Sequence, residues 1–378
     1  MHCYLSNFHH IRPKHEVDQA VVLDWVARAH AQAAAQTENV DYQTFYDAIK
    51  QRLLQLGVGP EKIARRGIHL DDFFQPWEEC EIYPVNQCPT GNGFKARSIF
   101  YDREASAILE RFYPEDAQLP PHLIHVTCTG YVAPSPAQRL ISNRKAGQRS
   151  IVTHAYHMGC NGAFPAIRMA MGYAGLPSPL PTSLVDIVHT ELCSLHMHPL
   201  RHSTEQLIVQ SLFADGFIKY SLSKVEGASC LKVLAVHEEL IPDSLESMSW
   251  RCEDAGLSMT LGKEVPILIG RALKGFLERL CTMAGIEYQA IVKQALFAVH
   301  PGGPKILQHV RELLDLSEAQ MSYSQKILRA YGNMSSATLP HIWEEMLNDP
   351  QVEENTPILS LAFGPGLSIC GALFQKVD

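Results

Sequence analysis

Short apolar runs alternate along this chain with segments whose apolar residues recur at helical spacing. The runs lie at residues 124–127, 151–155, 184–188 and 231–236. Such runs are typical of buried strands, and their alternation with helices is typical of an α/β fold. The alternation begins again near Ser223. We therefore expect two similar halves, residues 1–222 and 223–378, that share one core.

The composition predicts a soluble, cytoplasmic protein that acts on a small ligand. The 378 residues are 46% hydrophobic and 19% charged, which suffices for a large core. The net charge of −8 argues against a surface that follows the phosphates of a nucleic acid. The first residues lack the order of a secretory signal, and no apolar stretch is long enough to span a membrane.

Ten cysteines are scattered through the chain without the paired spacing of a metal site or a disulfide framework. A free cysteine is most often a small buried hydrophobe. Cys160 differs, because a β-branched run changes to helical spacing there and Pro165 places the helix start within a few residues. Backbone N–H groups at a helix start stabilise a thiolate, the species that attacks thioesters. Considered alone, a core cysteine beside a helix cap is the favoured alternative.

Two further joints between elements carry polar side chains beside glycines. His300 ends an apolar strand pattern and precedes a Pro-Gly-Gly turn, after which Pro304 can open a helix. Asn333 follows Gly332 in the turn between two helices. Histidine can act as a base or a donor, and an amide donates without titrating. Each residue alone is as well explained by a structural histidine or an Asx turn.

The order of these residues and their flanking sequences is more specific. Six stretches resemble, in order, those of type III polyketide synthases of the chalcone synthase-like family, and they extend from about residue 124 to 367: HVTCTG, GCNGAFPAIR, SLFADG, AVHPGGP, YGNMSSA and AFGPGL. HPGGP occurs throughout the wider ketosynthase superfamily, whereas GNMSSA followed by FGPGL is characteristic of type III enzymes. The resemblance implies a thiolase-like α/β fold, with two similar halves in an αβαβα arrangement, and a homodimer.

The resemblance also assigns the catalytic residues. The nucleophile falls on Cys160, and the family's histidine and asparagine fall on His300 and Asn333. The implied reaction is loading of an acyl-CoA starter on Cys160, followed by decarboxylation of malonyl-CoA beside His300 and Asn333. CoA thioesters are then the substrates, and no separate cofactor or metal is expected.

The same motifs assign five residues to the substrate pocket. Phe213 and Met259 fall on the family's gatekeeper positions, and three residues fall on positions that line the growing-chain cavity: Thr129, Cys193 and Ser335. Trp250 stands where plant members carry a small residue, and Ala133 stands where they carry a methionine that crosses the dimer interface. These departures, with the flexibility of methionine, predict a fatty acyl starter and a pyrone or resorcinol-type product. Plain core residues are the alternative for Met259 and Trp250.

Two groups of residues receive no functional assignment. Five cations near the N-terminal helices do not align with the family's CoA-binding residues, and a solvated helix face explains each equally well: Lys50, Arg52, Lys62, Arg65 and Arg66. Three histidines lack a cysteine or carboxylate that would complete a metal site: His196, His198 and His202.

Three other classes of protein share part of this pattern. A 3-oxoacyl-carrier-protein synthase of the initiation type has a similar triad, but that family usually carries glycine where Pro365 stands. A catalytically silent thiolase-fold subunit would not need Cys160, His300 and Asn333 intact. A papain-like protease orders its residues in the same way, but its nucleophile motif and secretory context are absent here.

Overall fold

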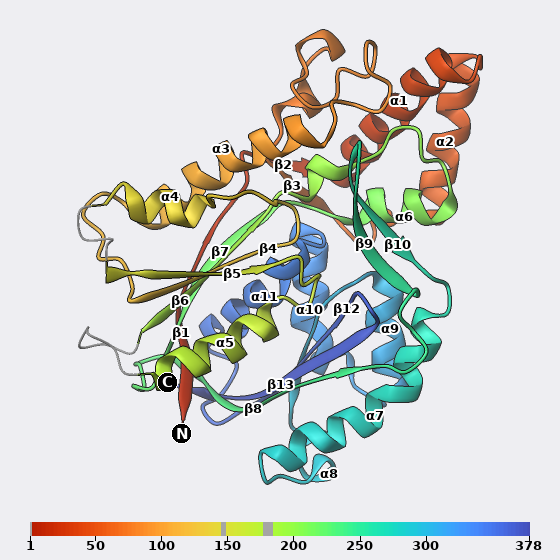
Figure 1. Ribbon diagram of the computed structural model, residues 1–378. Helices are drawn as coiled ribbons and strands as arrows, with labels where there is room; N and C mark the ends of the chain where they lie inside the picture. Colours follow the sequence, from red (N-terminus) through yellow and green to blue (C-terminus); the bar gives the residue numbers. More distant parts are fainter. Residues whose placement is uncertain (1, 145–148, 177–183) are drawn as a thin grey trace.

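A computed structural model describes residues 2–144, 149–176 and 184–378, shown in Figure 1. Within these residues the largest sheet has nine strands in the order β11-β12-β13-β8-β1-β7-β6-β4-β5. The bounds of these strands are β1 Cys3–Ile11, β4 His122–Thr127, β5 Ile151–Tyr156, β6 Val185–Glu191, β7 Gly216–Ser223, β8 Cys230–Leu240, β11 Leu296–Val299, β12 Pro357–Gly364 and β13 Ser368–Val377.

The strand pairing repeats itself across the middle of this sheet. In the first run β1 pairs antiparallel with β7, β7 antiparallel with β6, and β6 parallel with β4. In the second run β8 pairs antiparallel with β13, β13 antiparallel with β12, and β12 parallel with β11. The first strands of the two runs, β1 and β8, pair with each other. Two similar sets of strands are thus present, while the exact boundary at residues 222 and 223 stays a prediction.

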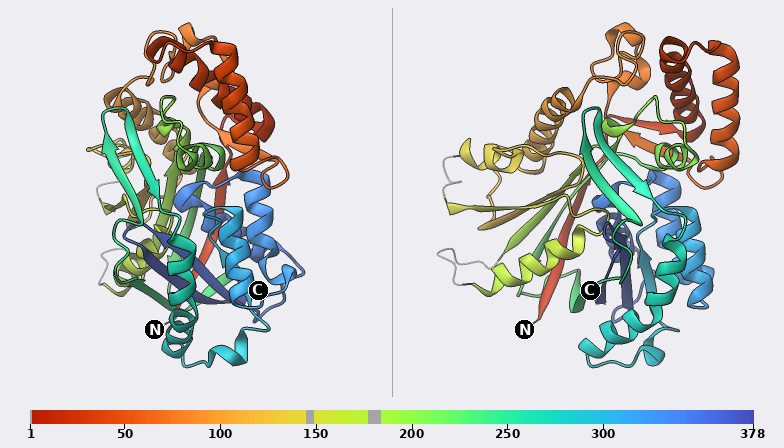
Figure 2. Two further views of the ribbon diagram at one scale, coloured as in Figure 1. Left: turned by 90° about the vertical axis from the view of Figure 1, so that its right-hand side faces the viewer. Right: turned by 45° about the vertical axis from the view of Figure 1, so that its right-hand side comes forward.

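Helices α5 (Ala163–Gly175) and α11 (Thr338–Asn348) lie between the two sets of strands (Figures 1 and 2). Phe164 of α5 and Trp343 of α11 are fully buried and place their ring centroids 6.0 Å apart. Each helix precedes an equivalent strand, since α5 leads to β6 and α11 leads to β12. The middle layer of the molecule is therefore a pair of contacting helices, one from each half.

The remaining helices cover the outer faces of the strands. Ile187 in β6 and Ile358 in β12 belong to the middle core, whereas their neighbours Val188 and Leu359 belong to two outer cores. This alternation is the period-two pattern of strands buried on both faces. The outer and connecting helices are α1 Gln19–Thr37, α2 Tyr42–Leu56, α3 Phe94–Phe112, α4 Pro136–Ser142, α6 Thr204–Leu212, α7 Val265–Met283, α8 Tyr288–Ile291, α9 Pro304–Leu313 and α10 Glu318–Tyr331. The layers are therefore αβαβα, as expected.

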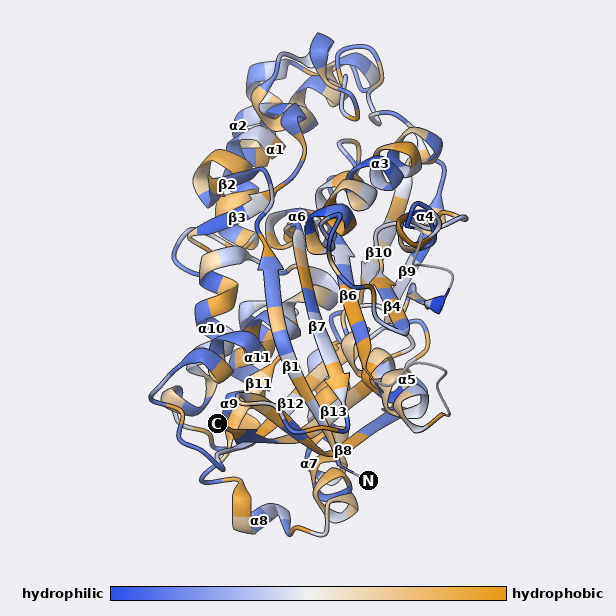
Figure 3. Ribbon diagram, turned by 90° about the vertical axis from the view of Figure 1, so that its left-hand side faces the viewer, coloured by the Kyte–Doolittle hydropathy of each residue, from blue (hydrophilic) through white to orange (hydrophobic). Residues whose placement is uncertain are grey.

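Two smaller sheets complete the fold. One pairs β2 (His15–Asp18) with β3 (Arg65–Ile68), and the other is a hairpin of β9 (Met248–Glu253) and β10 (Gly256–Leu261). Figure 3 shows hydrophobic residues along the central strands and a mixture of hydrophilic and hydrophobic residues along the outer helices. Among the helices that the structure describes, none has both the length and the apolar character needed to cross a membrane.

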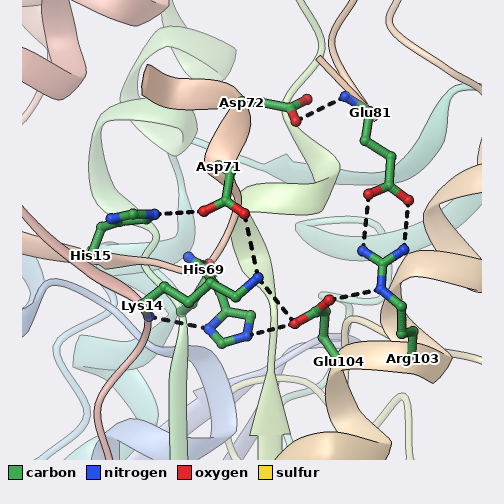
Figure 4. Close-up of polar contacts among 9 residues, drawn as sticks. Lys14, His15, His69, Asp71, Asp72, Glu81, Arg103 and Glu104 are labelled. Atoms are coloured by element: carbon green, nitrogen blue, oxygen red, sulfur yellow. Dashed lines mark hydrogen bonds and ion pairs between the residues drawn. The ribbon is translucent and has the colours of Figure 1, made fainter. Parts of the chain in front are cut away.

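A polar cluster joins the end of β3 to α3 (Figure 4). The Lys14 backbone N–H donates to His69 Nδ1 at 3.2 Å, so His69 Nε2 carries a proton and donates to Glu104 Oε2 at 3.0 Å. Arg103 Nε donates to the other carboxylate oxygen of Glu104 at 2.8 Å. The bond from His69, with help from Arg103 and Lys14, lowers the pKa of Glu104 to about 2. The His69 backbone N–H in turn donates to Asp215 at 2.6 Å, which links this cluster to the middle of the chain.

Candidate active site

Cys160 lies in the turn between β5 and α5. The helix begins at Ala163, three residues after Cys160, and Pro165 lies in its first turn, as the sequence predicts. Gly159 has a φ of +84°, and a Cβ there would lie 2.3 Å from Pro365 Cδ, so only glycine fits this close approach. The side chain of Cys160 is buried, and the residue is 9% exposed.

His300 follows the last residue of β11, and its backbone N–H donates to Leu361 O at 2.8 Å. The residue is 1% exposed, and both ring nitrogens are buried without a hydrogen-bond partner among the residues that the structure describes. Buried polar groups are nearly always paired, and an unpaired one costs about 1–3 kcal/mol. Such a group therefore indicates a place where a ligand completes the site.

Asn333 is held firmly by its backbone and by one side-chain atom. Its N–H donates to Leu212 O at 3.1 Å, and its carbonyl accepts from the Ala214 N–H at 2.8 Å. Its Oδ1 accepts from the Ser335 N–H at 2.9 Å, which fixes the amide plane. The amide nitrogen Nδ2 is buried and has no acceptor within the described part of the chain. Asn333 thus presents a free, oriented donor.

The structure brings the three predicted catalytic residues together at one cavity. Cys160, His300 and Asn333 line it together with Phe213 and Met259. A second cavity shares five residues with the first, Cys160, Phe213 and Met259 among them. It is also lined by the remaining pocket residues predicted from the sequence: Thr129, Cys193 and Ser335. All eight predicted site residues therefore surround two cavities that meet at Cys160.

Burial favours the neutral forms of both Cys160 and His300. Burial raises the pKa of Cys160 to about 12, and the carboxylate of Glu191 adds to this effect, while the nearby polar side chains of Ser335 and Asn333 oppose it. Burial also lowers the pKa of His300 to about 3. A neutral thiol at Cys160 and a neutral imidazole at His300 are therefore the expected forms at neutral pH. Burial therefore opposes the thiolate that the helix start favours at Cys160.

Sequence reasoning missed Glu191, the last residue of β6. Its carboxylate is fully buried and accepts hydrogen bonds from the Cys128 N–H at 3.0 Å, from Thr129 Oγ1 at 2.8 Å and from Ser336 Oγ. Cys128 Sγ accepts from the Gly159 N–H at 3.0 Å, directly before Cys160. Glu191 thus fixes Cys128 and Thr129 in position, and Cys128 in turn contacts the residue before Cys160. The strand gave no local signal for this role, because VDIVHTE also carries Asp186, His189 and Thr190.

The two departures from the plant pattern have different surroundings. Trp250 in β9 lines the second cavity, pairs across the hairpin with Met259, and donates from Nε1 to Cys128 O at 2.6 Å. Trp250 therefore lines the cavity that Cys160 also lines. Ala133 lies exposed in the loop before α4, where nothing in a single chain tests its proposed place at a dimer interface.

The five cations near the N-terminal helices do not share one environment. Lys50 is paired with Asp24 at 2.8 Å, and Arg65 with Asp18 at 3.0 Å. Arg65 and Arg66 lie in β3 and not on a helix, and Arg66 is only 2% exposed, so the interpretation as a solvated helix face is wrong for both. The reason is that β3 packs against the end of α6, a long-range contact that the local charge pattern does not contain.

Two of the three histidines in the 196–202 segment form hydrogen bonds within the chain. His196 Nε2 lies 2.8 Å from Thr129 O, and His202 Nδ1 lies 2.8 Å from His30 Nδ1. Within residues 2–144, 149–176 and 184–378, no group of three or more histidine, cysteine or acidic side chains is placed to hold a metal ion.

Comparisons with known proteins agree with this geometry. Residues 232–378 match the model of the family described as chalcone and stilbene synthases, C-terminal domain. A putative chalcone synthase of Bacillus subtilis is 28% identical over 308 residues, which cover 76% of this chain and 82% of that protein. A 1,3,6,8-tetrahydroxynaphthalene synthase of Streptomyces coelicolor is 26% identical over 322 residues, 83% of this chain and 82% of that protein.

Two relatives from Dictyostelium discoideum are far longer than this chain. They are named probable polyketide synthase 1 and polyketide synthase 37, and the match spans only 8% and 9% of their lengths. Among solved structures, the type III polyketide synthase domain of a Dictyostelium hybrid enzyme superposes with a TM-score of 0.81 at 21% identity, with 100% of both chains covered. The S. coelicolor synthase superposes with a TM-score of 0.76 at 23% identity, with 99% of both chains covered.

These matches define the class of protein. The fold is the thiolase-like α/β fold of the type III polyketide synthases. Residues 232–378 are similar to the C-terminal domain of chalcone and stilbene synthases. The resemblance drawn from the six motifs is thereby confirmed.

Proposed function

We propose that this chain is a type III polyketide synthase, an acyltransferase that extends an acyl-CoA starter by decarboxylative condensation with malonyl-CoA. One observation carries the proposal. His300 and Asn333 line the same cavity as Cys160, and both have buried nitrogens without a partner among the residues that the structure describes. Two preorganised donors beside a nucleophile are what stabilises the oxyanion of a reacting thioester.

In the proposed reaction Cys160 loses its proton to His300 as its sulfur attacks the starter thioester. The tetrahedral oxyanion collapses, the carbon–sulfur bond to CoA breaks, and CoA leaves as its thiol with the proton returned. The acyl group stays on Cys160. Malonyl-CoA then binds with its thioester oxygen toward His300 and Asn333, loses its carboxylate as CO₂, and leaves an enolate that both donors stabilise. The enolate carbon attacks the acyl thioester and frees the Cys160 thiolate.

The walls of the cavities support an alkyl starter. Around the triad the first cavity is lined by apolar side chains, among them Leu212, Val265 and Ile306. Trp250 reduces the space available to a ring in the second cavity. We therefore propose a fatty acyl starter and a pyrone or resorcinol-type product. The chemistry uses CoA thioesters as substrates and requires neither a separate cofactor nor a metal.

A homodimer is also proposed. Strand β5 forms one edge of the nine-stranded sheet, and two large apolar side chains near this edge are exposed, Ile151 at 58% and Tyr131 at 61%. An exposed edge with apolar neighbours favours pairing with a second copy. Light scattering on the purified chain tests this proposal directly.

The proposed function is tested by incubating the chain with octanoyl-CoA and malonyl-CoA and identifying the products by mass spectrometry. Pyrone or resorcinol products, absent from Cys160→Ala and His300→Ala variants, are expected. Replacing the CoA thioesters by acyl carrier protein thioesters separates this function from a single-condensation synthase. Products formed only from carrier protein, or a single extension in every reaction, would contradict the proposal.

A further inference from the structure

Arg66 is a buried cation whose charge has no counterpart. The residue is 2% exposed, and its Nη1 donates to two carbonyls at the end of α6, Gln210 O at 2.8 Å and Phe213 O at 2.9 Å. Its other two nitrogens, Nε and Nη2, are buried and have no acceptor among the described residues. Burial lowers the pKa of Arg66 only to about 9, so the guanidinium remains charged near neutral pH.

No carboxylate compensates this charge within ion-pair distance in the described part of the chain. Asp215 is near enough to influence Arg66, but its oxygens already accept from the His69 N–H at 2.6 Å, the Ser194 N–H at 2.8 Å and Ser194 Oγ at 2.6 Å. An isolated buried charge is strongly unfavourable unless it is paired. The Nε and Nη2 atoms of Arg66 therefore favour binding of an anion that the described part of the chain does not supply.

The two free nitrogens form one recognition edge. Nε and Nη2 carry parallel N–H bonds along one edge of the planar guanidinium group. The spacing of these two donors matches the two oxygens of a carboxylate. The cap on α6 uses Nη1 alone. Capping the helix thus explains why an arginine points here, but it does not explain why the opposite edge is left unpaired.

Arg66 lines the second cavity, the one that reaches Cys160 past Phe213. His198 lines the same cavity, and its Nδ1 is also buried without a partner in the described structure. Apolar side chains also line this cavity, Val26, Phe73 and Val209 among them. The cavity is therefore lined by the proposed nucleophile Cys160, by apolar side chains and by the cation of Arg66.

We propose that the Arg66 side of this cavity is a carboxylate subsite, which takes the terminal carboxylate of a dicarboxylic acyl chain whose thioester end reacts at Cys160. The inference rests on the proposed function, and it adds a second class of starter, the CoA monothioesters of dicarboxylic acids. The methylenes of such a chain pack against the apolar walls. Its carboxylate pairs with the free edge of Arg66, and His198 Nδ1 supplies a further polar contact.

The test compares dicarboxylic and monocarboxylic starters of equal length, from succinyl-CoA against butanoyl-CoA to dodecanedioyl-CoA against dodecanoyl-CoA. The rate of acyl transfer to Cys160 is measured for each by intact-protein mass spectrometry. At one length the dicarboxylic starter should be preferred by about tenfold or more, the range of a charge-assisted pair. Absence of a preference at every length would overturn the proposal.

Variants separate the subsite from the helix cap. Arg66→Gln should abolish the preference while the monocarboxylic starters still acylate Cys160, and Arg66→Lys should keep part of it. The matched control is Arg65→Gln, which removes the neighbouring exposed cation that pairs with Asp18. It should leave the preference unchanged. A preference that survives Arg66→Gln would also overturn the proposal.

A binding measurement on the unmodified protein covers the case in which Arg66 variants do not fold or no starter is condensed. Free suberate and free octanoate are compared for protection of Cys160 against alkylation by iodoacetamide. Suberate, or a homologue of the preferred length, should protect at about tenfold lower concentration. Equal protection by the two acids would contradict the carboxylate subsite even if polyketide products form. If suberate protects selectively but no polyketide products form, only the proposed function is contradicted.

Discussion

Replacing Asn333 separates two roles that the structure assigns to different atoms of one side chain. Oδ1 accepts from the Ser335 N–H at 2.9 Å and so stabilises the turn, whereas Nδ2 has no partner in the described part of the chain, and the residue lines the cavity. Asn333→Ala removes both atoms. Asn333→Ser keeps an oxygen that can accept from the Ser335 N–H but removes the amide donor.

The expected magnitudes differ between stability and catalysis. Loss of the acceptor leaves the buried Ser335 N–H unpaired, so Asn333→Ala should lower the free energy of unfolding by about 1–3 kcal/mol, and Asn333→Ser by less. Loss of the donor removes one of two groups that stabilise the enolate. Both variants should therefore decarboxylate malonyl-CoA about two to three orders of magnitude more slowly, equivalent to about 3–4 kcal/mol.

The assay measures CO₂ release from carboxyl-labelled malonyl-CoA, beside urea unfolding and acylation of Cys160 by the starter. Acylation should persist in both variants, because the proposed role of Asn333 is in decarboxylation more than in loading. The reasoning would be refuted if Asn333→Ser decarboxylated at the normal rate. Asn333 would then be a turn residue whose loss acts only through stability.

Three further outcomes follow from the same structure. Activity with butanoyl-, octanoyl- and dodecanoyl-CoA should rise by about fourfold in kcat/KM per methylene until the cavity is full, since each buried methylene contributes about 0.8 kcal/mol, and a preference for coumaroyl-CoA would show that the cavity suits rings instead. Trp250→Gly should enlarge the second cavity and shift the products, identified by mass spectrometry, toward bulkier starters or longer chains, so an unchanged product profile would place the indole outside the path of the chain. Glu104→Gln should lower the free energy of unfolding, measured in urea at neutral pH, by about 1–3 kcal/mol. Because folding lowers the pKa of Glu104 from 4.5 to about 2, this difference should be complete above about pH 4.5 and fade as the pH falls toward 2. A difference independent of pH would argue against the pairing with His69.

The triad could be predicted because its signals are local. The change from strand to helix periodicity, Gly159 before the nucleophile and Pro165 after it together fix the position of Cys160 within a few residues. The glycine-flanked turns at His300 and Asn333 are equally local. The convergence of the three residues on one cavity comes from the fold, which the motifs implied through resemblance.

The surroundings of the triad could not be predicted in the same way. Glu191 finds its donors in a loop more than sixty residues earlier and in a turn near residue 336, so no local pattern reports its role. Arg66 appeared to be a solvated cation because it follows two other cations, Lys62 and Arg65, within five residues. Its burial depends on the end of α6, whose carbonyls it caps.

The central claim is that Cys160 is the nucleophile that carries the acyl group. It is tested most directly by mixing the chain with octanoyl-CoA alone and mapping the acyl mass by peptide mass spectrometry. The matched controls are Cys160→Ala and Cys193→Ser, since Cys193 is a second thiol that lines the same cavity. We predict one octanoyl group on the peptide that contains Cys160, retained in Cys193→Ser and lost in Cys160→Ala. Octanoylation confined to other cysteines, or undiminished in Cys160→Ala, would contradict the account.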